Sequence, residues 1–449
     1  MGAFHAYDIR GVYGVDFDAS IVRKVGYFLP ELLDTREVLV GRDCRLSSPE
    51  IHDALVEGIN DAGADVVDIG LSTTPMVYYA TARYGFKASV QITASHNAPD
   101  CNGLKVSREN ALPVGLDTGL GKIQKWIEEG RPTPVSAVRG KVSARDIRND
   151  YLQYQLKFKK DLSNIRIAFD LSNGMSCLIA KDIFGDGPAY IFDDMDGSFP
   201  NHEPNPLVAS NREALCRLVR QTKADVGVIY DGDADRVMFV DENADFVAPD
   251  LVIALMSEYF INEKGARNPV VLQEIRSSKA VAEYLEPFGA EVHTWRVGRA
   301  FAAPKLREID GLWGGELAGH YYFKDFFYSD SGILASQIVL GIVSALKRRG
   351  ETLSRAVARI GKYRNSGEIN FRIGQKKEAM DALKEYFTSK ESPEAEMDFD
   401  GYRVEFKNWW FNIRPSNTEP FLRFICEADS DELLSEKVSQ AKSIIEKFV

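Results

Sequence analysis

Short apolar runs alternate along the chain with longer stretches in which apolar residues recur at helical spacing. Near the N-terminus this pattern predicts, in order, a strand at 37–43, a helix at 49–63, a strand at 64–70, a helix at 75–85 and a strand at 88–93. Strands separated by helices favour right-handed crossovers and a mostly parallel sheet.

The same pattern recurs twice further along the chain. Residues 164–174 pair a strand with a turn, and residues 223–241 read as two strands that flank an acidic turn. Residues 268–295 add a strand, a helix and another strand. The sequence therefore predicts three similar α/β domains with mixed sheets, at 1–146, 147–250 and 251–365.

The last part of the chain differs. A strand at 367–374 and a helix at 376–390 precede several adjacent strands and a final helix. This order predicts a fourth domain, 366–449, of the α+β class with an antiparallel sheet. The charged stretch 389–398 predicts a solvated loop.

The composition excludes several classes of protein. The 449 residues are 45% hydrophobic and 27% charged, which is typical of a globular chain of about three or four domains. A net charge of -11 without blocks of like charge argues against nucleic-acid binding. Five cysteines without a C-x-x-C pair indicate a reducing compartment. Because neither a signal peptide nor a membrane span is evident, we expect a soluble cytoplasmic protein.

The acidic turn contains three aspartates spaced by two: Asp231, Asp233 and Asp235. In an extended loop this spacing aims all three carboxylates to one side. Such an oxygen-only set suits Mg²⁺ better than zinc. A calcium EF-hand is excluded, since Arg236 stands where glycine is needed and the flanks resemble strands. A solvated hairpin turn rich in Asp and Gly is the alternative.

A second polar stretch, TASHNAPDCNGLK, begins where a predicted strand ends, at the edge where open α/β sheets place ligands. Ser95 is not in a G-x-S-x-G elbow, so a hydrolase triad is not indicated. His96 follows it, and Asn102 and Gly103 predict a turn before Lys105, a candidate proton carrier or phosphate clamp. The alternative is an ordinary strand-to-helix loop.

Two further loops carry polar groups beside glycines or prolines. RPSNTE offers the planar fork of Arg414 and neutral donors for an anion. WGGELAGH offers Glu316 as an acceptor for sugar hydroxyls and His320 as a group that can titrate near neutral pH. Ordinary turns and a structural histidine are the alternatives for these loops.

A serine nucleophile, a hard-metal site, an anion loop and a polyol loop together match phosphoryl transfer on a sugar phosphate, which needs positioning and charge neutralisation more than a triad. The whole chain resembles the α-D-phosphohexomutases, in particular the phosphomannomutase/phosphoglucomutase branch. TASHNAPDCNGLK resembles that family's phosphoserine loop, DGDADR its metal loop, GGELAGH its sugar loop and RPSNTEP its phosphate loop. The opening AYDIRGVYG resembles the branch's N-terminal segment.

The resemblance implies four domains around a central cleft. It implies that phosphorylated Ser95 donates its phosphoryl group to a hexose 1-phosphate or 6-phosphate, and that the resulting hexose 1,6-bisphosphate reorients before Ser95 takes back the other phosphate. A catalytic amount of the bisphosphate acts as primer. The expected partners are hexose phosphates, with neither nucleic acid nor membrane, and the expected state is a monomer or dimer.

The resemblance also implies residue roles. Mg²⁺ is held by Asp231, Asp233, Asp235 and, through its phosphate, Ser95. The residues implied in catalysis are Ser95, Lys105 as general acid/base, His96, Arg10 and Arg236. The residues implied in substrate binding are Tyr7, Glu316, His320, Arg414, Ser416, Asn417, Thr418 and Arg423.

Two positions depart from the branch. Ala318 stands where the sugar loop usually has serine, and Arg299 stands where a histidine is frequent. Both leave the preference between mannose and glucose phosphates open. Phosphoglucosamine mutase is the rival within the family, although its opening segment differs from AYDIRG. A non-catalytic sugar-phosphate-binding protein is the rival outside it, against which the intact Ser95 and the three aspartates argue.

Overall fold

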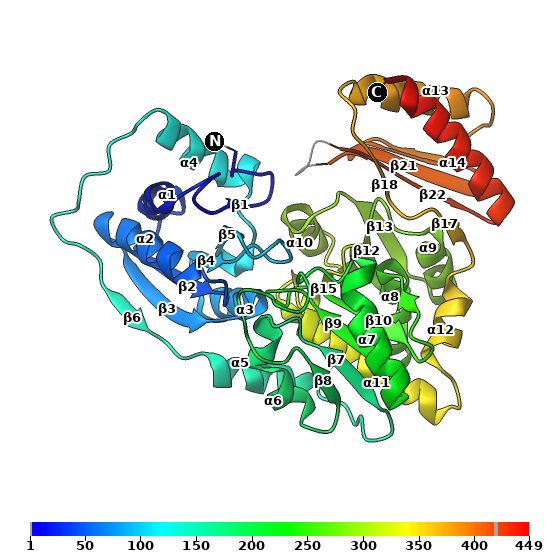
Figure 1. Cartoon of the computed structure of the whole chain (residues 1–449), viewed down its shortest axis with the longest axis horizontal. Helices are drawn as coiled ribbons and strands as arrows, with labels where there is room; N and C mark the ends of the chain where they lie inside the picture. The colour runs from blue at the N-terminus through cyan, green and yellow to red at the C-terminus, as the bar shows by residue number, and fades with distance from the viewer. Residues whose placement is uncertain (1, 417–420, 449) are drawn as a thin grey trace.

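A computed structural model describes residues 2–416 and 421–448 and arranges them in four β-sheets, each made from one stretch of the chain (Figure 1). We refer to each sheet with its helices as a unit, the first at the N-terminus and the fourth at the C-terminus. The first three units have mixed sheets, and the fourth is antiparallel. The predicted fold class is confirmed.

The first sheet has the order β1-β5-β4-β2-β3-β6. Its strands are β1 Ile9–Val12, β2 Glu37–Arg42, β3 Asp65–Leu71, β4 Ala88–Ile92, β5 Cys101–Arg108 and β6 Val142–Ala144. Its helices are α1 Ala19–Leu32, α2 Ser48–Asp61, α3 Thr74–Tyr84 and α4 Gly121–Glu128. The strands β4, β2, β3 and β6 are parallel, so the predicted alternation of strands and helices is confirmed here.

The turn predicted at Asn102 and Gly103 is wrong, because both residues lie inside β5. Gly103 pairs with Arg10 of β1, and β5 also pairs with β4. A Cβ atom at Gly103 would lie 2.2 Å from the carbonyl oxygen of Ile9, so glycine allows close strand packing at this point and makes no turn. The loop that holds Ser95 therefore joins two strands and does not lead into a helix.

The second and third sheets have the orders β11-β10-β9-β7-β8 and β13-β12-β14-β15-β16. The second unit contains β7 Ile167–Asp170, β8 Ala189–Ile191, β9 Val226–Tyr230, β10 Val237–Asp241, β11 Phe246–Val247, α5 Arg148–Gln155, α6 Ala180–Phe184 and α7 Ala209–Thr222. The third unit contains β12 Val270–Glu274, β13 Glu291–Trp295, β14 Trp313–Gly315, β15 Tyr321–Phe323, β16 Ser329–Asp330, α8 Pro249–Leu255, α9 Lys279–Leu285, α10 Arg299–Glu308, α11 Gly332–Arg348 and α12 Leu353–Ile360.

The first three units share part of one hydrophobic core. One continuous cluster of buried side chains includes Met76 from α3, Val228 from β9 and Phe323 from β15. The nearly all-apolar helix α11 packs against β9 and β10, so a helix that follows the third sheet in sequence covers the second. Burial of this much common apolar surface fixes the first three units against one another.

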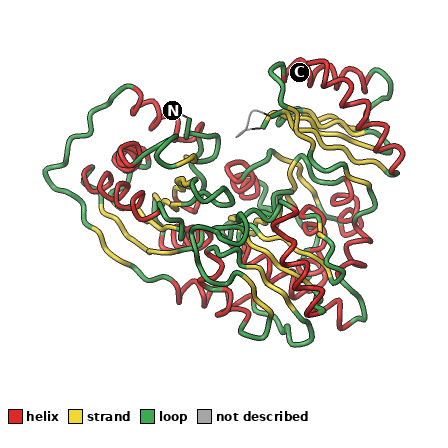
Figure 2. Tube along the Cα trace, in the orientation of Figure 1, coloured by secondary structure: helices red, strands yellow, loops and turns green. Residues whose placement is uncertain are grey.

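The fourth unit has a hydrophobic core of its own. Its strands are β17 Arg364–Asn365, β18 Ile369–Phe371, β19 Ala395–Met397, β20 Tyr402–Glu405, β21 Trp409–Pro415 and β22 Leu422–Ala428, and its helices are α13 Lys376–Thr388 and α14 Asp431–Ile445. Figure 2 shows both helices on one face of this sheet. The solvated loop predicted at 389–398 is wrong in part, because its end forms β19, which pairs with β20 at the sheet edge.

Two of the predicted domain limits divide elements that the structure keeps together. The limit at 250/251 falls inside α8, and the limit at 365/366 separates β17 from the sheet that it joins. No described helix has the length and apolar character needed to cross a membrane.

Candidate functional site

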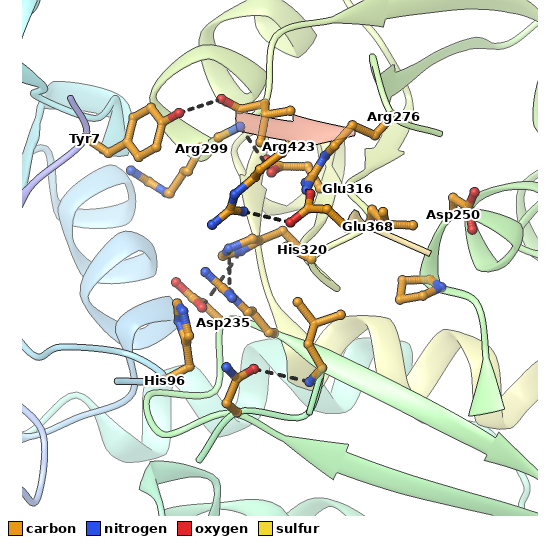
Figure 3. A pocket seen from close by; sticks show the side chains of 18 of the residues that line it. Tyr7, His96, Asp235, Asp250, Arg276, Arg299, Glu316, His320, Glu368 and Arg423 are labelled. Carbon is orange, nitrogen blue, oxygen red and sulfur yellow. Dashed lines mark hydrogen bonds and ion pairs between the residues drawn. The ribbon is translucent and has the colours of Figure 1, made fainter. Parts of the chain in front are cut away.

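A cavity of about 990 Å³ lies where the four units meet (Figure 3). The residues predicted for the site that line it are Tyr7, Arg10, His96, Lys105, Asp235, Arg236, Glu316, His320 and Arg423, together with the two departures Arg299 and Ala318. Among the described residues, the predicted members that do not line it are Ser95, Asp231, Asp233, Arg414 and Ser416. Asn417 and Thr418 lie outside the described residues.

Ser95 lies just after β4 and is 1% exposed. Its hydroxyl donates to Asp231 Oδ2 at 2.8 Å and lies 3.2 Å from Nδ1 of His96. Because Ser95 belongs to the first unit and Asp231 to the second, the hydrogen bond brings the two predicted loops together at one point.

The hairpin loop between β9 and β10 gathers the three aspartates. Their carboxylate oxygens lie within 4.8 Å of one another, and all three side chains are buried. Among the described residues, one oxygen each of Asp233 and Asp235 has no hydrogen-bond partner. Because buried carboxylate oxygens are costly without a partner, this all-oxygen cluster fits a hard divalent cation such as Mg²⁺.

Lys105 reaches this cluster from β5. Its Nζ lies 2.6 Å from Asp233 Oδ2 and 2.5 Å from Asp235 Oδ2. Burial disfavours the ammonium, but the two carboxylates outweigh it and raise the pKa of Lys105. Burial and the two neighbouring carboxylates also raise the pKa of Asp231 well above its usual range. Lys105 is thus a cation held against the aspartates.

A chain of largely buried polar groups runs from the acidic loop to the predicted sugar loop. Arg236 Nε donates to His320 Nε2 at 2.8 Å, and His320 Nδ1 lies 2.6 Å from Asp330 Oδ2. A histidine that accepts on Nε2 carries its proton on Nδ1, so Asp330 fixes the tautomer. The sequence analysis missed Asp330, which follows a tyrosine and a serine without any local motif.

Both departures from the branch lie at the cavity wall. Arg299 donates to Asp330 Oδ1 at 3.0 Å and to the carbonyl of Ala111 at 2.8 Å, and its guanidinium lies 3.6 Å from the ring centre of Tyr78. These contacts tie the third unit to the first. Ala318 presents only a methyl group to the cavity.

Glu316 is held by its neighbours in the third unit. Its carboxylate accepts hydrogen bonds from the Tyr322 hydroxyl and from the backbone N–H of Gly298, the latter at 3.1 Å. Burial raises the pKa of Glu316. The backbone carbonyl of Val297 accepts a hydrogen bond from Tyr7 at 3.0 Å, so the first unit contacts the same wall.

Arg10 approaches from β1 on the side of the phosphoserine-like loop. It pairs with Asp8 and donates to Asn97 Oδ1 at 3.1 Å. Burial disfavours the charged guanidinium, but Asp8 outweighs it and the pKa of Arg10 is raised. The side chain is thus a half-buried cation beside the loop that carries Ser95.

The arginines of the fourth unit are held by carboxylates. Arg414 Nε donates to Asp400 Oδ1 at 3.0 Å, while its Nη2 has no hydrogen-bond partner among the described residues. The other oxygen of Asp400 accepts from the backbone N–H of Val297 at 2.9 Å. Asp400 therefore links the predicted phosphate loop to the third unit.

A second network joins the third and fourth units. Arg423 Nη1 lies 3.1 Å from one oxygen of Glu368, and Arg276 Nη1 donates to the other at 2.7 Å (Figure 3). Arg276 also makes two hydrogen bonds of 2.9 Å to Glu274. The sequence analysis missed Arg276 and Glu368, although Arg276 just follows the carboxyl end of β12, a position where α/β sheets place ligands.

These features define a class of enzyme. A hydroxyl that touches a carboxylate cluster suited to a hard cation, with several arginines around one cavity, is the arrangement that phosphoryl transfer requires.

Comparison with known proteins identifies the family. Four models of the phosphoglucomutase/phosphomannomutase family match: alpha/beta/alpha domains I, II and III at residues 1–133, 147–244 and 248–363, and the C-terminal domain at 368–441. The chain therefore belongs to the phosphoglucomutase/phosphomannomutase family, as the resemblance indicated.

Relatives match the chain along nearly its whole length. A phosphomannomutase of Methanocaldococcus jannaschii is 33% identical over 99% of this chain and 98% of its own. A protein of Xanthomonas campestris named phosphohexose mutases is 34% identical, with 98% of each chain covered. A crystal structure of a phosphoglucomutase/phosphomannomutase family protein from Burkholderia thailandensis superposes with a TM-score of 0.87 at 27% identity, covering 99% of this chain and 98% of that one.

Proposed function

We propose that this enzyme interconverts hexose 1-phosphates and hexose 6-phosphates through a phosphoserine at Ser95 and a hexose 1,6-bisphosphate. The observation that carries the proposal is the contact of the Ser95 hydroxyl with Asp231, at 2.8 Å, inside the carboxylate cluster. The names of full-length relatives, phosphomannomutase and phosphohexose mutases, support the substrate class.

Each half-reaction moves one phosphoryl group. The P–O bond at Ser95 breaks, a P–O bond to a sugar hydroxyl oxygen forms, and the proton of that hydroxyl ends on the serine oxygen. The bisphosphate then changes its orientation within the cavity, and the reverse transfer moves its other phosphoryl group to Ser95. The cavity of about 990 Å³ leaves room for this rotation.

We assign the metal site to Asp231, Asp233 and Asp235, joined by the phosphate of phosphorylated Ser95. A bound Mg²⁺ would neutralise charge on the phosphoryl oxygens. Phosphorylation adds nearly two negative charges beside three carboxylates, so it should tighten the metal site. Arg10 and Arg236 supply fixed positive charge nearby.

Lys105 is assigned the role of proton donor and acceptor at the sugar oxygen, and it also clamps the phosphoryl group. The raised pKa of Lys105 describes the state in which Asp233 and Asp235 bind the ammonium. A cation in the carboxylate cluster would compete for those oxygens and release Lys105 toward the sugar. His96 lies beside the serine and lines the same wall.

The remaining assignments concern the sugar and its other phosphate. Glu316 accepts hydrogen bonds from the sugar's 3- and 4-hydroxyls, with His320 and Tyr7 close by. The non-reacting phosphate is bound by Arg414, Ser416, Asn417, Thr418 and Arg423. Four domains, with limits near 146, 250 and 365, surround the cavity.

Intact-mass spectrometry and coupled turnover assays test this function. The protein incubated with glucose 1,6-bisphosphate should gain one phosphoryl group, and Ser95→Ala should gain none. Turnover should require the bisphosphate primer and a divalent cation. Much faster turnover of glucosamine 6-phosphate than of mannose or glucose 1-phosphate would instead identify a phosphoglucosamine mutase, and sugar-phosphate binding without any turnover would identify a binding protein.

A further inference from the structure

Arg45, in the loop after β2, is enclosed by the loop that carries Ser95. The guanidinium is wholly buried and donates hydrogen bonds to four backbone carbonyls. The acceptors and distances are Ser95 at 2.9 Å, Asn97 at 2.7 Å, Ala98 at 2.6 Å and Cys101 at 3.0 Å. A single side chain thus fixes the backbone of the whole loop.

Ser95 has a backbone conformation that a serine rarely adopts. Its φ of 53° lies in the left-handed region, which is unfavourable for a residue other than glycine and persists only where the surroundings enforce it. Two groups enclose its carbonyl: Arg45 donates to it, and the backbone of Gly232 packs behind it. A Cβ atom at Gly232 would lie 2.4 Å from the carbonyl oxygen.

Arg45 is itself held in place by one residue of its own loop and by one residue of the second unit. Asp43 forms an ion pair with its Nε at 3.2 Å and also accepts from the Arg45 backbone N–H at 3.0 Å. The ring of Phe199, from the second unit, lies 4.9 Å from the guanidinium. The Arg45 guanidinium is therefore held by both units that meet at Ser95, the first and the second.

We propose that Arg45 is a positioning residue for phosphoryl transfer: by holding four loop carbonyls it enforces the left-handed conformation of Ser95 that aims the hydroxyl at Asp231. This inference rests on the proposed function. The transfer breaks a P–O bond of the bisphosphate, forms a P–O bond to the Ser95 oxygen and leaves the serine proton on the sugar oxygen. A displacement of the serine oxygen by about 1 Å can slow such a transfer by about 10²-fold.

The test measures the rate at which Ser95 gains a phosphoryl group from saturating glucose 1,6-bisphosphate, by quenched-flow intact-mass spectrometry. Arg45→Met keeps the length and burial of the side chain but removes every donor. We expect this rate to fall by about 10–100-fold, while the bisphosphate concentration that gives half the maximal rate changes by less than about twofold, since Arg45 does not touch the cavity.

Arg403→Met is the matched control. Arg403 is another buried arginine that donates to two carbonyls, those of Ile275 and Ser277, both at 2.6 Å, but it lies where the third and fourth units meet. The Arg403→Met variant should lose about as much thermal stability as Arg45→Met. Its rate of Ser95 phosphorylation at saturating bisphosphate should stay within about twofold of the wild-type rate. Loss of the same rate in both variants would show a general effect of stability and overturn the proposal.

Arg45→Lys keeps the proposal testable if Arg45→Met does not fold. A lysine preserves the charge but cannot reach all four carbonyls with one ammonium, so the rate should fall by about tenfold. Wild-type rates in any folded Arg45 variant would overturn the positioning role and leave the proposed function intact. A wild-type protein that gains no phosphoryl group would overturn the proposed function itself, and this inference with it.

Discussion

The two ends of the cavity differ in what holds them. At one end, the phosphorylation cluster lies between units that share part of one hydrophobic core, and its side chains bind one another directly. It comprises Ser95, Lys105, Asp231, Asp233 and Asp235. At the other end, the anchoring cluster joins the third unit to a fourth unit with a separate core. It comprises Arg276, Glu368, Asp400, Arg414 and Arg423.

The carboxylates play opposite parts at the two ends. In the phosphorylation cluster they are the excess charge, and Lys105 offsets only part of it, so the cluster is preformed for a cation. In the anchoring cluster, Asp400 binds Arg414 and Glu368 binds Arg423. Both arginines are proposed to bind a phosphate. Because a bound phosphate must share or displace these contacts, the fourth unit is the part of the molecule expected to shift on binding.

The largest effect is expected from Asp233→Ala. Asp233 binds Lys105 and Thr74 and offers an oxygen without a hydrogen-bond partner among the described residues, so its loss should disable the cation site. Turnover should fall on the order of 10³-fold, with little change in the melting temperature of the metal-free protein, because removing one of three crowded carboxylates relieves repulsion. Near-normal steady-state turnover in this variant would exclude the metal role.

How far the sequence predicts these two ends also differs. The three aspartates are spaced by two in a turn between predicted strands, so their spacing indicates that the carboxylates point to one side. Ser95 follows the end of a predicted strand, where α/β sheets place ligands. Asp330, Arg276 and Glu368 lie in no such motif and gain their roles from pairing with arginines or carboxylates that are not close to them in sequence. Arg45 was missed for the same reason, since its acceptors are carbonyls 50 to 56 positions further along the chain.

Arg414→Ala should show that phosphate binding in the anchoring cluster helps phosphoryl transfer at Ser95, at the other end of the cavity. Arg414 is 3% exposed and has one nitrogen free of hydrogen-bond partners among the described residues. Its removal should raise KM and lower kcat, together by about 10–100-fold in kcat/KM, because the non-reacting phosphate positions the reacting one. Steady-state kinetics with both 1-phosphates measure this. The control is Lys407→Ala, which removes an exposed positive charge from the same unit. An unchanged KM in Arg414→Ala would contradict the assignment of Arg414 to phosphate binding.

Glu368→Gln tests whether the anchoring cluster is a competitor for phosphate. Its carboxylate is half-buried, but Arg276 and Arg423 outweigh the cost of this burial and lower the pKa of Glu368. Removing the charge weakens the contact of Glu368 with Arg423 and reduces repulsion of the substrate, so KM should fall by about two- to fivefold with little change in kcat. Glu378→Gln, exposed on α13, controls for the net charge of the fourth unit. A raised KM would mean that Glu368 positions Arg423 and does not compete with phosphate.

The smallest effect is expected where α8 faces the fourth unit, at Asp250, which is 2% exposed. Burial, with a contribution from the nearby carboxylate of Glu427 on β22, raises the pKa of Asp250 from 3.8 to about 7. A carboxyl whose pKa is raised in the folded protein holds its proton better when folded, so it costs no stability below about pH 4 and increasingly more as the pH rises to about 7. The melting temperature of Asp250→Asn, relative to the wild type, should therefore increase by about 2–4 °C between pH 5 and pH 8. Asp186→Asn, an exposed aspartate, should show no such trend. A difference that stays flat with pH would show that burial and the Glu427 carboxylate together do not raise the pKa of Asp250, and that stability at this junction does not depend on the charge of Asp250.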